Sequence, residues 1–239
     1  MTFSKIRETI LDLLFPRRCP VCDKPVKPFG KLICETCRHK PVYIRGPKCM
    51  KCGKALNQEE TEYCGDCRKI RHDYDTGRAV FSYGSVSDAI YRFKYRGRQE
   101  YADYFAACME ESLGSWLREN HVQALVPVPI HAKRRRIRGY NQAELLAKRL
   151  SERIGIPVRT DLVMRVRSTK PMKDLSPGER QNNLKKAFKI CSNDVKLDTI
   201  VIIDDIYTTG STIDAVSREL RGAGISKTHF AALAIGRGI

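Results

Sequence analysis

The sequence predicts an α/β fold in which a parallel sheet follows a small cysteine-rich module. Eight of the ten cysteines lie before residue 68, where they form four Cys-x-x-Cys pairs. From Asp75 onward, apolar runs of strand length alternate with segments of helical periodicity. Such alternation produces right-handed crossovers and a parallel sheet that helices cover on both faces. With 239 residues, the chain is long enough for one medium domain and one small module.

The first predicted element is a short amphipathic helix over residues 1–16. Glu8 and Asp12 interrupt its apolar residues, so it lacks the uncharged core of a secretory signal. Because its polar face carries acids as well as bases, we expect it to dock on its own protein rather than on a membrane. No window approaches about 18 consecutive apolar residues, so no membrane span is expected. These features predict a cytoplasmic protein whose cysteines are kept reduced.

The cysteine pairs predict two structural zinc sites in a module over residues 17–70. The pairs are Cys19/Cys22, Cys34/Cys37, Cys49/Cys52 and Cys64/Cys67, and successive pairs begin 15 residues apart. Two thiolates on one tight turn supply half of a tetrahedral zinc site, and four protein ligands leave no position for a catalytic water. Disulfides do not persist in a reducing compartment, which favours metal. The Pro41–Pro47 stretch favours consecutive over interleaved pairing of the turns, and both pairings stay open.

A second domain, over residues 76–239, is predicted from the alternating patterns. The predicted strands are Arg78–Tyr83, Ala124–Ile130, Leu162–Val166, Thr199–Ile203 and Thr228–Ile235, and the predicted helices are Gln99–Glu119, Asn141–Ile154 and Thr212–Gly222. Ligands of such sheets bind at the carboxyl ends of the strands. The residues that follow the strands are therefore the first candidates for a site.

Two adjacent acids and a hydroxyl-rich loop follow one of these strands. The candidate residues are Asp204, Asp205, Thr208, Thr209, Gly210, Ser211 and Thr212. Backbone amides of the loop, its hydroxyls and the start of the next helix together make an anion cradle. Gly210 allows the backbone to approach a phosphate closely. Paired carboxylates beside such a cradle suit sugar hydroxyls or a magnesium ion.

The chain is strongly basic, with 44 Lys and Arg against 27 Asp and Glu and a formal net charge of +17. This excess indicates polyanionic partners such as nucleic acid or phosphorylated small molecules. Five bases, Lys133, Arg134, Arg135, Arg136 and Arg138, are expected in the loop after the strand Ala124–Ile130. The segment Tyr91–Arg98 alternates aromatic and basic residues. This alternation is typical both of a surface that stacks single-stranded bases and of a half-buried strand, and the two interpretations stay open.

The segment Ile200–Thr212 resembles the phosphoribosyl-pyrophosphate (PRPP) motif of type I phosphoribosyltransferases: four apolar residues, two acids, then Thr-Thr-Gly-Ser-Thr. The four cysteine pairs, Phe93–Arg98, Val126–Pro129 with Arg138–Gln142, and Arg165–Phe188 are similar to elements of the ComF family. Members of that family join a zinc-bearing module to a phosphoribosyltransferase-type domain. Met172 is a departure, because many members carry Gln there.

The resemblance implies roles for the candidate residues. Asp204 and Asp205 would hold the ribose hydroxyls, with magnesium accompanying PRPP, and Thr208–Thr212 would hold the 5′-phosphate. Lys94, Arg134, Arg135, Arg136 and Arg138 would contact pyrophosphate or DNA.

ComF proteins are associated with DNA uptake and natural transformation, so the resemblance implies single-stranded DNA and other competence proteins as partners. The alternative is an active phosphoribosyltransferase with an unidentified acceptor. No segment of the sequence is typical of the hood that recognises a base in such enzymes.

Overall fold

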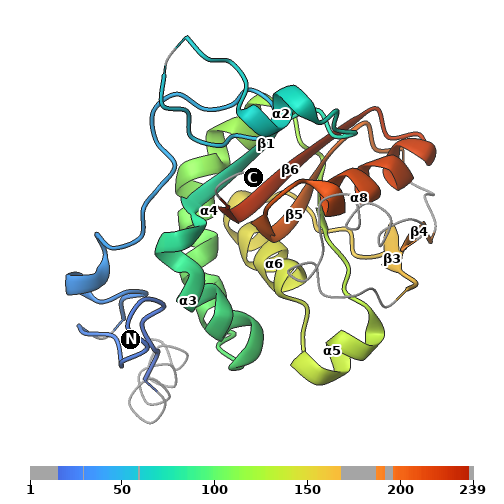
Figure 1. Cartoon of the computed structure of the whole chain (residues 1–239). Helices are drawn as coiled ribbons and strands as arrows, with labels where there is room; N and C mark the ends of the chain where they lie inside the picture. Colours follow the sequence, from blue (N-terminus) through green and yellow to red (C-terminus); the bar gives the residue numbers. More distant parts are fainter. Residues whose placement is uncertain (1–15, 29, 59, 168–186, 192–195, 237–239) are drawn as a thin grey trace.

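A computed structural model describes residues 16–28, 30–58, 60–167, 187–191 and 196–236 (Figure 1). The helix predicted over residues 1–16 lies outside the described residues except for Pro16, and so does most of the segment Arg165–Phe188. None of the described helices is long and apolar enough to cross a membrane.

Four parallel strands form the central sheet, in the order β1-β6-β5-β2. They are β1 (Gly77–Ser82), β2 (Ala124–Pro127), β5 (Thr199–Tyr207) and β6 (Lys227–Ile235). In the register, Ile202 of β5 lies between Val126 of β2 and Phe230 of β6. Nearly every residue of β5 and β6 is buried, as expected for strands with cover on both faces. The predicted α/β fold with a parallel sheet is confirmed.

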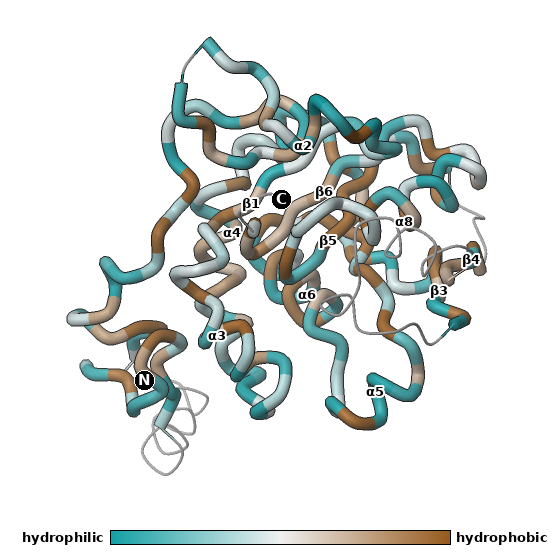
Figure 2. The backbone as a smooth tube through the Cα atoms, viewed as in Figure 1, coloured by the Kyte–Doolittle hydropathy of each residue, from teal (hydrophilic) through white to brown (hydrophobic). Residues whose placement is uncertain are grey.

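The sheet separates the buried apolar residues into two cores, and the other elements cover its two faces (Figures 1 and 2). One face carries α3 (Tyr83–Tyr95), α4 (Tyr101–Glu119) and α6 (Gln142–Ile154); the other carries α8 (Ser211–Gly222) and the antiparallel pair of β3 (Val163–Arg165) and β4 (Phe188–Ile190). Side chains of β5 alternate between the cores, with Val201 and Ile203 in the first and Ile200 and Ile202 in the second. Both cores are therefore anchored on the same strand.

Three predicted strands differ from the structure in length or pairing. The strand expected over Ala124–Ile130 ends at Pro127, and Pro129 just beyond it has no amide hydrogen to continue a ladder. The strand expected over Leu162–Val166 pairs only with β4 and does not join the central sheet. The strand expected over Thr199–Ile203 continues to Tyr207, because β6 pairs with it along its whole length.

The segment Tyr91–Arg98 does not form the half-buried strand that its alternation allowed. It belongs to the end of α3 and the turn after it, and Phe93 is fully buried while Tyr91 and Tyr95 are 53% and 56% exposed. The buried residues of α3, namely Val86, Ala89, Ile90 and Phe93, recur every three or four positions, as a helix requires. A window that begins at Tyr91 is too short to show this period.

The basic segment after β2 is a helix rather than the expected loop. Helix α5 (Ala132–Arg138) begins after His131, whose Nδ1 accepts a hydrogen bond from the Lys133 amide at 3.2 Å. Gly139 ends it in the left-handed conformation, with φ of 81°. Alanine, lysine and arginine all favour helix, so composition and caps agree. The five bases are therefore spread around a helix and do not line one loop.

The cysteines gather in two clusters that pair the turns consecutively. The sulfurs of Cys49, Cys52, Cys64 and Cys67 lie within 4.8 Å of one another, and so do those of Cys19, Cys22 and Cys34. Cys37, which lies on the 3₁₀ turn Glu35–Cys37, is buried in the same small apolar cluster as Cys19. The preferred pairing is confirmed.

Both clusters fit structural zinc. A hydrogen bond to the Cys49 thiolate, together with burial, raises the pKa of Cys52 to about 12, because neighbouring thiolates resist a further negative charge. A divalent cation removes this obstacle and holds all four sulfurs as thiolates. Within the described residues the clusters offer only sulfur ligands.

The two zinc ribbons contact the α/β domain differently. The first lies beside α3 and the start of α4 (Figure 1), where Asp23 accepts hydrogen bonds from Tyr101 at 2.6 Å and Arg98 at 3.2 Å. The second shares a core with the sheet, because Cys49, Cys52 and Cys64 pack in one cluster with residues of β5, β6 and α8. A Cβ at Gly53 would lie 2.6 Å from the Gly77 carbonyl oxygen, so the turn after Cys52 requires glycine.

We predict that the protein binds about two zinc ions and that losing each has a different effect on the sheet. Cys19→Ser and Cys49→Ser should each remove one zinc ion. Only Cys49→Ser should lower the melting temperature of the sheet, because Cys49 is part of its core. The fluorescence of Trp116, the single tryptophan, reports on the sheet because its ring lies 5.8 Å from that of His229 in β6. Equal losses in the two variants would contradict the shared core.

Candidate ligand cleft

The two acids lie where β5 loses its neighbour on one side. Strand β2 pairs with Ile200–Ile203 and ends, whereas β6 continues beside Asp204 and as far as Tyr207. Asp204 and Asp205 are therefore within β5, at its carboxyl end, and not in a loop after it. One edge of β5 therefore has no neighbouring strand at this point, and the carboxyl end of a parallel sheet is where such folds bind their ligands.

Asp205 already has a cationic partner inside the protein. Its Oδ2 lies 2.8 Å from Nζ of Lys94, and both side chains are largely buried. Lys94 comes from α3, so the first core face supplies the counter-charge. The sequence motif placed Lys94 among the ligand-binding residues, and the structure brings it directly to the acids.

Asp204 has no ion pair among the described residues, and its pKa is raised above the usual value of a carboxyl group. Burial and the charge of Asp205 raise the pKa of Asp204 to about 7, although Lys94 and Arg165 act in the opposite direction. Arg165, at the end of β3, is itself mostly buried, and this burial and the charge of Arg134 lower its pKa to about 10. Two acids and three cations from four elements are thus close enough for their charges to interact. Arg165 was not among the predicted site residues, although the sequence placed it in the strand expected over Leu162–Val166 and at the start of the family-like segment Arg165–Phe188.

The hydroxyl-rich loop forms the start of α8. Gly210 precedes the helix with φ of 79°, and its carbonyl accepts from the Asp214 amide at 2.8 Å. The hydroxyls of Thr209 and Ser211 lie 3.0 Å apart, and Thr212 follows in the first turn. Thr208 is exposed. The free amides of a 12-residue helix, together with these hydroxyls, suit a phosphate dianion.

A segment between the two predicted domains supports this loop. We call residues His72–Asp75 the strap. His72 Nδ1 lies 2.9 Å from Oδ2 of Asp214, and the Asp73 amide donates to Oδ1 of the same carboxylate at 2.8 Å. A Cβ at Gly210 would lie 2.9 Å from Cε1 of His72 and 2.7 Å from the Tyr207 hydroxyl. The strap therefore packs against the loop from behind, and any residue larger than glycine would displace it.

The strap contacts α8 and β5 at further points. Tyr74 and Tyr207 share a hydrogen bond of 2.7 Å between their hydroxyls. Asp73 pairs with Arg218 at 2.6 Å, and Asp75 pairs with Arg221 at 2.5 Å. None of these residues was predicted as functional, since no motif marks them.

The predicted cations of α5 differ in their surroundings. Arg138 donates to the Tyr95 hydroxyl and to Gln142, each at 3.0 Å, and lies over the Tyr95 ring at 4.7 Å. Arg134 is half-buried near Arg165. Arg135 pairs with Glu144 at 3.1 Å. The exposed positions on this helix are Ala132, Lys133, Arg135, Arg136 and Ile137.

Family models match both parts of the chain. Residues 10–68 match the double zinc ribbon domain, and residues 140–238 match the phosphoribosyl transferase domain. Fold, clusters and cleft define a zinc-ribbon protein with a phosphoribosyltransferase-type α/β domain.

Whole-chain relatives narrow this class. The chain is 30% identical over 222 residues to competence protein F of Haemophilus influenzae, covering 90% of this chain and 89% of the relative. It is 30% identical to competence protein ComFC of Bacillus subtilis, covering 86% and 85%, and 28% identical to DNA utilization protein YhgH of Escherichia coli K12, covering 87% and 92%. The chain belongs to the ComF family, as the sequence motifs predict.

We predict that the raised pKa of Asp204 makes this residue destabilising above neutral pH. The unfolded chain loses this proton near pH 4 and the folded protein near pH 7, so stability falls across that interval as pH rises. Asp204→Asn removes the charge, and should raise the melting temperature by a few degrees at pH 8 and have little effect near pH 4. Asp205→Asn is the control: it deprives buried Lys94 of its partner and should lower the melting temperature. Calorimetry of both variants at the two pH values, without ligand, measures these melting temperatures. An equal rise in the melting temperature of Asp204→Asn at both pH values would contradict the prediction.

Proposed function

We propose that the cleft binds a pentose 5-phosphate carrying a second phosphate group, with PRPP as the representative ligand. The observation that supports this most is the adjacency of the two chemistries. Asp204 and Asp205 lie at the carboxyl end of β5, and the cradle at Thr208–Thr212 follows on the same chain. Carboxylates accept hydrogen bonds from vicinal hydroxyls, while helix amides and hydroxyls surround a phosphate dianion.

The residues around the acids suit the rest of such a ligand. Lys94, Arg165 and Arg134 supply positive charge beside the two acids, which a pyrophosphate group would use. Lys94 already neutralises Asp205, so magnesium would enter bound to the pyrophosphate. Bound there, magnesium would neutralise phosphate charge, and Asp204 would be the carboxylate left to interact with it, since Asp205 is paired with Lys94.

We further propose that a single-stranded DNA surface borders this cleft. Tyr91 and Tyr95 are exposed one helical turn apart on α3, with ring centroids 5.1 Å apart, and Arg138 covers the Tyr95 ring. Exposed aromatic rings beside cations are what a protein uses to stack bases and neutralise phosphates. Because Lys94 contacts Asp205 and the next residue, Tyr95, contacts Arg138, the two surfaces meet within one dipeptide.

The names of the relatives agree with a role in DNA uptake. Two are competence proteins and one is a DNA utilization protein. We infer that this chain handles incoming single strands during natural transformation, together with other competence proteins, and that the phosphate-bearing ligand occupies a cleft beside the strand. The alternative is transfer of phosphoribose to an acceptor with release of pyrophosphate.

We predict that PRPP with magnesium binds and that Asp204→Asn weakens it about ten-fold or more, since a hydrogen bond to a charged group contributes roughly 1.5–3 kcal/mol. In the wild type, affinity should rise as pH passes about 7, because Asp204 then becomes a carboxylate. Titration calorimetry checks both. Asp198→Asn, an exposed acid before the other end of β5, should leave binding unchanged.

The outcomes of that titration separate the alternatives. If Asp204→Asn leaves the affinity for PRPP unchanged, PRPP does not bind in this cleft. Pyrophosphate released by the wild type in the presence of an acceptor, and lost in Asp204→Asn, would establish the transferase alternative.

We predict that changing both Tyr91 and Tyr95 to Ala weakens the binding of single-stranded DNA at least ten-fold, because base stacking contributes roughly 1–3 kcal/mol per ring. The matched change of both residues to Phe should preserve affinity, since the rings remain. Fluorescence anisotropy with labelled oligothymidine and with a duplex of equal length measures the effect. Equal affinity for duplex and single strand would contradict a stacking surface.

A further inference from the structure

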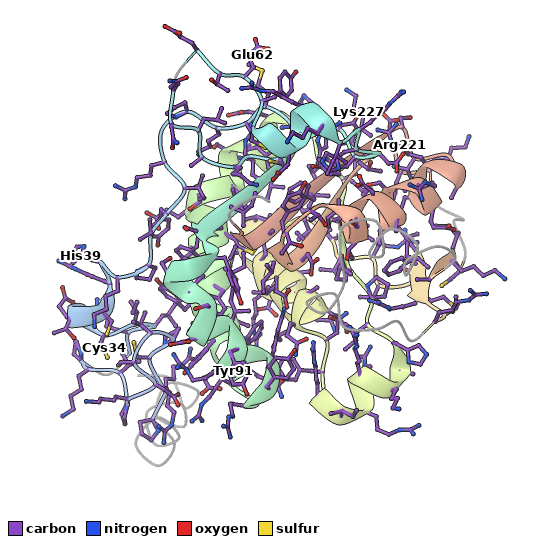
Figure 3. All side chains as sticks on the ribbon, viewed as in Figure 1. Cys34, His39, Glu62, Tyr91, Arg221 and Lys227 are labelled. Carbon is purple, nitrogen blue, oxygen red and sulfur yellow. The ribbon has the colours of Figure 1, made fainter. Side chains whose placement is uncertain are left out.

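Residues of the second zinc ribbon and the strap, together with Arg221, line an open cavity that is separate from the acids and the hydroxyl-rich loop. Its volume is about 680 Å³, within the range of pockets that hold small ligands. Side chains that line it are Lys51, Tyr63, Arg68, Lys69, Arg71 and Arg221. Arg221 and Tyr91 lie at opposite ends of the molecule (Figure 3), so the cavity is remote from the aromatic surface of α3.

The side chains that line the cavity carry a net positive charge, because its two acids are already paired with arginines. Asp73 and Asp75 also line the cavity, but they pair with Arg218 and Arg221. Arg68, Lys69 and Arg71 are exposed at the rim. In the part of the chain that the structure describes, no carboxylate pairs with any of these three, and their charge is available to a ligand. They come from α2 (Gly65–Lys69) and the residues that lead into the strap.

Other cations already offset part of the charge of the zinc cluster. Four thiolates carry excess negative charge even with zinc bound, and nearby cations are expected to offset it. The charges of Lys54, on the turn after Cys52, and of Arg78, in β1, act on the thiolates of this cluster. Lys54 also pairs with Asp66 at 2.5 Å.

Two other features of the cavity favour a ligand with a flat ring. Tyr63 is 41% exposed at its edge, and its carbonyl holds Arg68 through a hydrogen bond of 3.0 Å from Nε. His72 and Tyr74 also line the cavity, and their rings stack with centroids 4.8 Å apart, so part of its wall is aromatic.

We propose that this cavity is a second contact for single-stranded nucleic acid, with phosphodiesters on Arg68, Lys69 and Arg71 and a base against Tyr63. The inference rests on the proposed DNA function. Cations on the rim, spread over several residues, fit a chain of phosphates better than one phosphate, which convergent donors would surround. The recess behind them admits an unstacked base, which a single strand offers and a duplex does not.

The experiment compares three variants that each lose three charges. Arg68, Lys69 and Arg71 changed together to Gln should reduce the slope of log affinity for oligothymidine against log salt by about two, since single strands lose about 0.7 per phosphate contact. Lys31, Arg38 and Lys40 changed together to Gln on the first ribbon, all exposed, should leave the slope unchanged. Zinc content, measured in each variant, confirms that the second ribbon is intact.

Tyr63→Trp gives a direct second measurement. Oligothymidine should quench the fluorescence of the new indole, beyond any change in Trp116 that the wild type shows. Inorganic phosphate or a duplex should quench it much less. An unchanged salt slope in the Arg68/Lys69/Arg71 variant, or an equal fall in the first-ribbon variant, would overturn the cavity contact.

The third variant separates the two proposals. Arg134, Arg135 and Arg136 changed together to Gln test the surface beside the cleft. If the wild type binds no single strand, the proposed DNA function fails. If it binds and only the variants of α3 and α5 weaken it, the cavity inference alone fails.

Discussion

The packing of the second zinc cluster against the sheet is the constraint on which the rest of the structure depends. Three of its four cysteines are in the core that β5, β6 and α8 share. The Gly77 amide at the start of β1 donates to the Lys51 carbonyl at 2.7 Å, so the ribbon and the edge strand are joined through backbone as well as side chains. From the same ribbon the chain passes into the strap, whose Tyr74 contacts Tyr207, and Tyr207 stacks on Phe230 with ring centroids 4.5 Å apart. The second cysteine cluster, the core and the loop before α8 are thus successive parts of one packed unit.

The first ribbon supports the other half of the cleft. Arg92, on α3, donates to the carbonyls of Pro20 and Val21 in the first cysteine turn at 3.0 and 2.9 Å. Arg98, just beyond α3, contacts Asp23 of the same turn. Lys94 lies between these two arginines, so the ribbon fixes the part of α3 that presents Lys94 to Asp205. One ribbon therefore orients the cation beside the acids, and the other supports the cradle.

Much of this arrangement follows from local sequence, and the remainder does not. Periodicity predicts the sheet and the long helices, and the even spacing of the cysteine pairs predicts two metal sites. The strand, acids and loop up to Thr212 predict the cleft because they are contiguous. The strap was missed because His72 and Asp214 are 142 residues apart and meet only through the fold. Arg165 was missed for the same reason, since its pKa shift depends on Asp204 and Arg134 from other elements. Helix α3 was missed because its period shows only over a window longer than the aromatic segment.

The geometry also bears on the two functions that the family suggests. A nucleic-acid surface and a sugar-phosphate site would be independent alternatives if they lay on different parts of the protein. Here Lys94 and Tyr95 are consecutive, and each contacts a residue of one of the two proposed sites, Asp205 and Arg138 respectively. A substitution at Lys94 therefore disturbs both and cannot assign either. Residues that belong to one site alone, such as Asp204 in the cleft or Tyr91 on the exposed face of α3, are the ones that can separate the functions.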